Sequence, residues 1–190
     1  MNTLKDCLAT VKDPRRGQGR RYDLVHTLLY CVLAVASGGT SYRKIHAFID
    51  THWVRLNAVF GSTFKRAPAY TAVRKIVQGL DAAEVERALR LLAGEQVQEA
   101  APEALAQRAL VALDGKTLRG SLDRFEDRKA AQVLSALAVH ERVVLGHVLI
   151  EDEDKDHEIA AAQRLIQELG LAGCVFTLDA LHCQKKQLSR

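Results

Sequence analysis

Residues 109–121 read ALVALDGKTLRGS, and this stretch decides the interpretation of the carboxyl-terminal half of the chain. Its apolar beginning has the length of a buried strand and ends at Asp114, after which Gly115 lets the chain turn. A strand over residues 109–113 would leave Asp114 at its carboxyl end. The acid is therefore expected at the rim of a sheet, pointing out of it.

A second stretch of the same kind, CVFTLDALHCQ, covers residues 174–184, and its apolar run ends at Asp179. Two such strands side by side would bring two carboxylates to one rim. Carboxylates are hard oxygen ligands for a divalent cation and leave coordination positions open for phosphate and water. The alternative is that each Asp only ends a strand and starts a turn, where Asp is common.

Together, DGKTLRGS and FTLDALHCQKK resemble the DDE transposases of bacterial insertion sequences, and among these the H-repeat-associated type. The similarity extends from about Asp13 to the end of the chain. It implies an RNase H-like catalytic domain in which two Asp and one Glu hold two Mg²⁺ (or Mn²⁺) ions. By this resemblance, Asp114 is the first acid and Asp179 the second.

Four polar residues beside the two acids are further candidates for the same site. Lys116 and Arg119 follow the first acid and could neutralise the phosphate of the scissile strand. His182 and Gln184 follow the second acid and could line the groove. Ordinary solvated loops explain all four residues equally well.

The resemblance is incomplete at the carboxyl end, because nothing after Gln184 matches the family's catalytic Glu. We therefore expect the amino-terminal part of a transposase, from a truncated or split reading frame, with an incomplete RNase H-like sheet. With two carboxylates in place of three, weak Mg²⁺ or Mn²⁺ binding and little activity of the chain alone are expected.

Charge is divided unevenly along the chain. Residues 1–80 hold 13 Lys and Arg against 4 Asp and Glu, a net charge of +9, and residues 81–190 carry a net charge of −5. A basic amino-terminal half indicates an electrostatic partner such as double-stranded DNA. A basic surface without a specific partner is the alternative.

Two groups of basic residues are candidates for DNA contacts. One is the loop between Asp13 and Asp23, in which phosphate-gripping and merely solvated side chains are both plausible. Its members are Arg15, Arg16, Arg20 and Arg21. The other is a helix over residues 70–80, with Arg74 and Lys75 opposite its apolar face. Short helices ending in a basic face fit a helix-turn-helix-like unit, and a plain helical bundle fits as well; the resemblance favours DNA, namely transposon ends.

Composition and motif spacing indicate in which cellular compartment the protein is expected. The four cysteines show no CxxC spacing, so a reducing bacterial cytoplasm, in association with the nucleoid, is the expected location. The apolar run over residues 24–36 follows two arginines, as in a signal peptide, but is shorter than the ~20 residues of a membrane span. We interpret the run as a buried helix and expect no membrane association.

The predicted organisation is α+β overall. An all-helical, basic, DNA-binding-like domain covers residues 1–98, a linker covers 99–108, and a partial RNase H-like α/β domain covers 109–190. The pattern of the last part is a strand, a hairpin of strands at 131–139 and 143–150, a helix ended by Gly170, and a strand at 175–178. A right-handed crossover would bring the last strand beside the first.

Three functions remain open from the sequence. The first is a DNA transposase fragment that is inactive alone, and the second is a non-catalytic DNA-binding protein that competes with the intact transposase. The third is a metal nuclease without sequence preference. A homodimer, or pairing with an intact transposase, is compatible with the first two.

Overall fold

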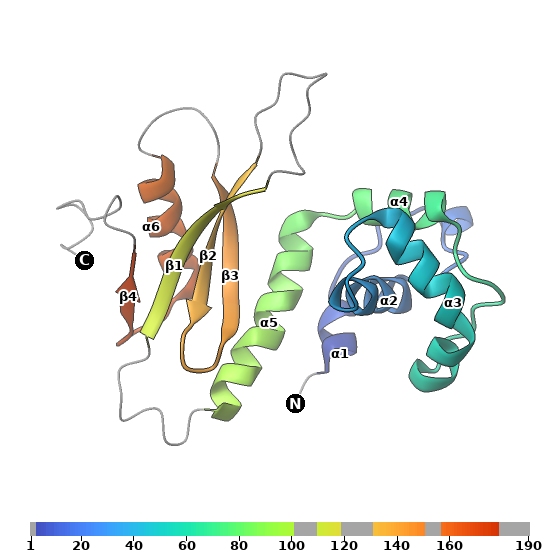
Figure 1. Cartoon of the computed structure of the whole chain (residues 1–190), viewed down its shortest axis with the longest axis horizontal. Helices are drawn as coiled ribbons and strands as arrows, with labels where there is room; N and C mark the ends of the chain where they lie inside the picture. The colour runs from blue at the N-terminus through green and yellow to red at the C-terminus, as the bar shows by residue number, and fades with distance from the viewer. Residues whose placement is uncertain (1–2, 101–109, 119–130, 151–156, 179–190) are drawn as a thin grey trace. The chain divides into compact units, whose positions relative to one another are not determined.

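The computed structural model describes residues 3–100, 110–118, 131–150 and 157–178 (Figure 1). The chain divides into two compact units, Met1–Leu92 and Ala93–Arg190. Helices build the first unit and a four-stranded sheet builds the second, so the mixed α+β class predicted from the sequence is confirmed. The division falls within a long helix, and nearly all of the predicted linker at 99–108 lies outside the described residues.

The first unit is a succession of helices around one apolar core. The elements are α1 (Leu4–Leu8), the short 3₁₀ helix η1 (Gly17–Gly19), α2 (Leu24–Ala36), α3 (Tyr42–Phe60), α4 (Tyr70–Gln78) and the beginning of α5 (Ala82–Ala100). Most of α2 is buried, as predicted, and Tyr30 and Leu29 lie at its centre. Of the helices that the structure describes, none combines the length and apolar character needed to cross a membrane.

A tight turn between α2 and α3 fixes how these two helices meet. Gly38 takes a left-handed conformation with φ of 92°, and the amide of Gly39 donates to the carbonyl of Ala34 at 2.8 Å. A Cβ at Gly39 would lie 2.8 Å from that same carbonyl oxygen, closer than real Cβ contacts come. Ser41 then caps α3 by accepting a hydrogen bond from the amide of Lys44.

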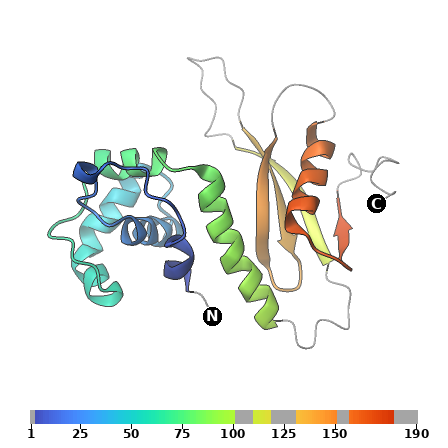
Figure 2. The same ribbon diagram turned by 180° about the vertical axis from the view of Figure 1, so that it is seen from behind.

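In the second unit, the strands are β1 (Leu110–Thr117), β2 (Gln132–Ala138), β3 (Val143–Ile150) and β4 (Val175–Thr177), with α6 (His157–Leu169) before β4. The sheet order is β3-β2-β1-β4, in which β2 pairs antiparallel with both neighbours and β1 pairs parallel with β4 (Figure 2). The predicted hairpin, the helix ending before Gly170 and the placement of the last strand beside the first are confirmed.

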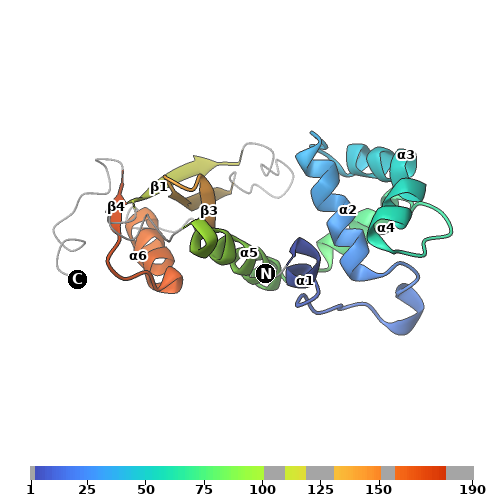
Figure 3. The same ribbon diagram turned by 90° about the horizontal axis from the view of Figure 1, so that it is seen from below.

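Helix α6 packs on one face of this sheet (Figure 3). Val111 and Leu113 of β1 join Leu134 of β2 and Leu165 of α6 in one buried cluster. Because side chains alternate along a strand, the residues between them face the other side of the sheet. The apolar periodicity of β1 and β2 therefore fixes which face is left for polar residues.

The prediction that β1 ends at residue 113, with Gly115 starting a turn, is wrong. The strand continues to Thr117, and Gly115 pairs with Leu134 in the middle of the antiparallel ladder with β2. The partner strand supplies hydrogen bonds for four more residues, and these outweigh the weak strand preference of glycine. Asp114 therefore lies within β1 and not at its end.

We expect Gly39→Ala to lower the free energy of unfolding of the first unit by about 1–3 kcal/mol, because the new methyl group collides with backbone that cannot move aside. Gly17→Ala is the matched control, since no atom lies within 4 Å of its Cβ position. Urea unfolding followed by fluorescence of Trp53, the single tryptophan, measures both. Equal effects of the two substitutions would contradict the close contact at Gly39.

Candidate functional site

Asp114 lies exposed on the face of the sheet opposite α6. Its neighbours Val111 and Leu113 point into the core, so the strand alternation turns Asp114 and Lys116 to the other side. Both side chains are exposed, and Lys116 lies two positions along the same strand face. The structure thus brings these two predicted site residues together, although at the middle of a strand face instead of at a rim.

Two residues that were not singled out from the sequence share this face with Asp114. Ser135 of β2 is the cross-strand partner of Asp114, and His147 of β3 is the next partner beyond Ser135. Directly paired residues point to the same face. Asp114 and His147 are exposed, and Ser135 is half-buried between them. The alternation of apolar and polar residues over 131–150 indicates which side chains share a face of the sheet. It does not indicate that Asp114, Ser135 and His147 are paired across the strands, because that depends on the register.

The second predicted acid lies outside the described residues. Asp179 lies just beyond the described residues, as do Arg119, His182 and Gln184. The described part of β4 pairs Leu110 with Val175 and Ala112 with Thr177, a constant offset of 65 positions. Of the predicted residues in this half of the chain, Asp114 and Lys116 are therefore the ones that the structure describes.

The carboxylate of Asp114 is a suitable ligand for a hard divalent cation, but one carboxylate supplies only part of the coordination that such an ion needs. An exposed carboxylate is the type of oxygen ligand that Mg²⁺ and Mn²⁺ accept, usually with several waters retained. Among the residues that the structure describes, no group of three or more His, Cys, Asp or Glu is arranged to hold a metal ion. Asp114 can therefore supply one ligand, and others must come from elsewhere.

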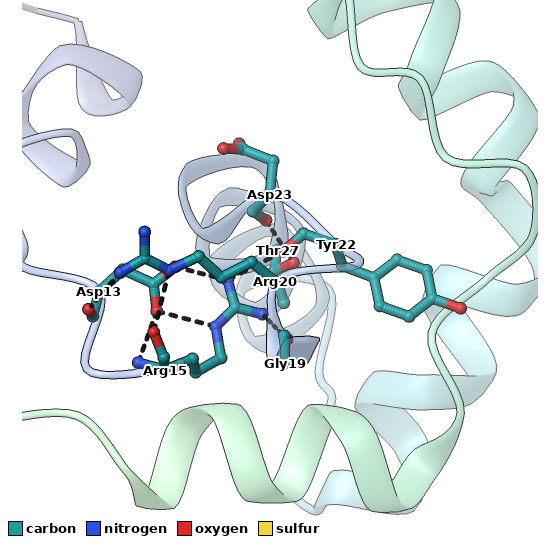
Figure 4. Close-up of polar contacts among 7 residues, drawn as sticks. All are labelled: Asp13, Arg15, Gly19, Arg20, Tyr22, Asp23 and Thr27. Atoms are coloured by element: carbon teal, nitrogen blue, oxygen red, sulfur yellow. Dashed lines mark hydrogen bonds and ion pairs between the residues drawn. The ribbon is translucent and has the colours of Figure 1, made fainter. Parts of the chain in front are cut away.

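In the first unit, the basic loop is organised around Arg15 (Figure 4). The Arg15 guanidinium donates to both carboxylate oxygens of Asp13, from Nε and Nη2, at 2.9 Å each. It also donates to the carbonyls of Gly19 at 3.3 Å and Tyr22 at 2.9 Å. With its side chain only 13% exposed, Arg15 joins the two ends of its own loop.

The other three arginines of the loop are oriented differently. Arg20 donates to the carbonyl of Arg15 at 2.9 Å, but its side chain remains 54% exposed. Arg16 and Arg21 are exposed, and the Arg21 guanidinium lies 5.8 Å from the centre of the Tyr22 ring. The two outer arginines, Arg16 and Arg21, are therefore available to an anionic partner, and so is the exposed part of Arg20. Arg15, by contrast, is held within the loop by its hydrogen bonds.

The loop borders a cleft of about 550 Å³ that also receives residues 61–64 from the turn after α3. A buried network holds that turn: Tyr30 and Ser62 share a hydrogen bond of 2.5 Å, and the Ser62 hydroxyl donates to the side-chain Oδ1 of Asn57. The side-chain Nδ2 of Asn57 then donates to the backbone carbonyl of Phe64 at 2.8 Å. Burial raises the pKa of the Tyr30 hydroxyl, which keeps this group neutral and able to donate.

Helix α4 presents the predicted basic face. Val73 and Ile76 are buried in the core of the unit, and Arg74 and Lys75 are exposed. Thr71 and Gln78 are exposed as well. The helix begins beside α3, where the Arg43 guanidinium lies 5.9 Å from the centre of the Tyr70 ring. Arg43 is exposed and adds a third positive charge close to the start of this helix.

Comparison with known proteins finds matches to transposases and to a transposase-associated family. Residues 5–93 match the family described as DDE_Tnp_1-associated. The chain is 28% identical to "Putative transposase YncI" of Escherichia coli O157:H7, covering 100% of this chain and 46% of that protein. It is 26% identical to "H repeat-associated putative transposase YhhI" of Escherichia coli strain K12, covering 97% of this chain and 47% of that protein.

These matches show that the chain is similar to transposases. More specifically, the matched relatives include H repeat-associated proteins, which supports the resemblance stated from the sequence motifs. The chain spans about half the length of the first curated relatives that it matches.

We expect the Asp13–Arg15 pair to make the stability of the first unit depend on pH. The hydrogen bond from Arg15 lowers the pKa of the Asp13 carboxyl in the folded state. The stability that this pair adds to the unit is therefore complete above the unfolded pKa of ~3.9, and it is lost as pH falls through the lower folded pKa. Asp13→Asn should therefore destabilise the unit at pH 7 and do so much less at pH 3.

Urea unfolding of both proteins at the two pH values measures this difference. In an Arg15→Ala background, Asp13→Asn should change little at either pH, because the main cause of the pKa shift has been removed. An Asp13→Asn effect of the same size at pH 7 and pH 3 would show that the ion pair does not hold the loop.

Proposed function

We propose that the chain binds transposon-end DNA through its helical unit and contributes Asp114 to a metal-dependent site for DNA strand cleavage and transfer. The observation that carries the proposal is the exposed carboxylate of Asp114 on a strand that pairs parallel with β4. Relatives whose printed names include "transposase" support the reaction class. The sheet with its crossover helix α6 supports an RNase H-like arrangement.

The β1–β4 register supports Asp179 as the second acid. Asp114 and Asp179 are separated by the same 65 positions as the paired residues Leu110 and Val175. If the parallel pairing continued by two residues, the two acids would be neighbours on adjacent strands, ~4.8 Å apart along the hydrogen-bonding direction. Neighbouring carboxylates at this spacing suit ligation of a shared cation or of two adjacent cations.

Each of the chain's own residues would then have a separate role at this site. Asp114 and Asp179 would hold Mg²⁺ or Mn²⁺, which supplies Lewis-acid stabilisation of phosphate oxygens when bound. Lys116, on the same face of β1 as Asp114, would neutralise the phosphate of the strand being cut. Asp114 would keep its carboxylate fixed through the backbone pairing of β1 on both sides, which preserves geometry during in-line attack.

The helical unit would supply DNA affinity. Arg74 and Lys75 are exposed on α4, and Arg43 lies beside the start of that helix. Arg16 and Arg21 are exposed on the loop that Arg15 holds together. Guanidinium and ammonium groups presented on fixed elements bind phosphates with little loss of side-chain freedom, and residues on a helix face can also read base edges.

We expect duplex DNA binding to weaken steeply with salt, and the double variant Arg74→Ala/Lys75→Ala to reduce the slope of log K against log [salt] by about 2 if each residue contacts one phosphate. Fluorescence anisotropy of a labelled duplex bearing the element's end measures the slope. Lys12→Ala/Arg55→Ala removes the same charge from exposed positions outside α4 and is the matched control. An equal loss in both variants would mean that α4 is not the interface.

We expect any DNA nicking by the chain to depend on Asp114, because in-line phosphoryl transfer needs metal ions held in fixed geometry by carboxylates. Any Mg²⁺- or Mn²⁺-dependent nicking should disappear in Asp114→Asn and survive in Asp50→Asn, which alters an exposed acid of α3. A nicking assay on DNA with and without the element's end tests both points. Cleavage that is indifferent to Asp114→Asn would overturn the site, and equal cleavage of unrelated DNA would indicate a nuclease.

A further inference from the structure

A histidine joins the two walls of the cleft in the helical unit. His26 lies in the first turn of α2, next to the basic loop, and Phe60 ends α3 just before the turn over residues 61–64. The His26 ring reaches from one wall to the other: Nδ1 lies 2.6 Å from Oδ2 of Asp23, and Nε2 lies 3.1 Å from the Phe60 carbonyl oxygen. The His26 side chain is only 14% exposed, so water has little access to these contacts.

Both oxygens that the His26 ring faces are hydrogen-bond acceptors. Asp23 caps α2, and its Oδ2 also accepts from the backbone amide of His26 at 2.9 Å. The Phe60 carbonyl belongs to the last turn of α3, where carbonyls have no partner inside the helix. A neutral imidazole carries one N–H and satisfies one acceptor, whereas an imidazolium carries two. The geometry is therefore satisfied only when both ring nitrogens of His26 are protonated.

The charges around His26 act in both directions. The Asp23 carboxylate is in direct contact and favours the imidazolium. Lys5 of α1 donates to the same Phe60 carbonyl at 3.1 Å and opposes a second positive charge there. The Tyr30 ring lies 6.3 Å away and is neutral, the turn over residues 61–64 carries no charge, and the cations of α4 are exposed away from the core. The other charged residues that line the cleft are Asp13, Arg15, Arg20 and Arg21.

We propose that His26 forms a proton-dependent bridge between α2 and α3. With a proton on both nitrogens, it holds the end of α3 against the start of α2, and loss of the Nε2 proton releases that wall of the cleft. Histidine changes charge between about pH 5 and 8, so the bridge responds near neutral pH. The folded unit needs the second proton and the unfolded chain does not. The stability that the bridge adds is therefore complete at low pH and is lost as pH rises through the range in which folded His26 releases that proton.

NMR of the histidine rings tests the bridge in the wild-type chain, without any substitution. Long-range proton–nitrogen correlations distinguish an imidazolium from either neutral tautomer. At about pH 7.5, His26 should still carry a proton on both nitrogens, whereas the exposed His52 of α3 should have lost one. At higher pH, the backbone amide signals of Gly61 and Thr63 should shift with the same midpoint as the loss of the His26 Nε2 proton. A single neutral tautomer of His26 at pH 7.5 would overturn the proposal.

Urea unfolding of two alanine variants separates the bridge from simple packing. His26→Ala should reduce the folding equilibrium constant roughly tenfold more at pH 5.5 than at pH 8.5, which is the size of one hydrogen bond to a charged group. His46→Ala is the matched control, because Nδ1 of His46 faces one acceptor, the Pro68 carbonyl at 3.0 Å, which a neutral imidazole satisfies. Its effect should be the same at both pH values. A loss in His26→Ala that is equally independent of pH would contradict the proton-dependent bridge.

Discussion

The hydrogen bonding of β1 on both of its edges is the constraint on which the second unit depends. Antiparallel pairing with β2 extends this strand through Asp114 and Gly115 to Thr117, and parallel pairing with β4 requires a crossover, which α6 provides. The crossover helix buries one face of the sheet. The carboxylate of Asp114 is consequently held on the other face by a strand that cannot shift without breaking pairs on two sides.

In the first unit, an arginine that resembles its neighbours in sequence has a different task. Arg15 is nearly buried and binds Asp13 with two hydrogen bonds, while Arg16 and Arg21 are exposed. Closing the loop in this way lowers the conformational freedom of the exposed arginines before any anionic partner binds. The basic loop thus combines one arginine that holds the loop together with others that are exposed, and the summed charge of the loop does not distinguish the two kinds.

Local signals predicted most of the elements, because those signals act within a few residues. Ser41 caps α3, Gly170 follows α6 and the alternating residues around His140 form the β2–β3 hairpin. The end of β1 was mispredicted because Gly115 is tolerated where a partner strand continues. The alignment of His147 with Asp114 was missed because it depends on pairing between three strands and on a register shift near Ala136, which no short stretch of sequence encodes.

The central claim is that a divalent cation binds at the carboxylate of Asp114. Paramagnetic broadening of backbone amide NMR signals by Mn²⁺ tests it most directly, because the effect falls off steeply with distance from the ion. Broadening should be strongest for residues 113–115 and Ser135, which face each other in the β1–β2 ladder, and should vanish in Asp114→Asn. Broadening centred on Asp13 and Asp23 of the helical unit, or unchanged by Asp114→Asn, would contradict the account.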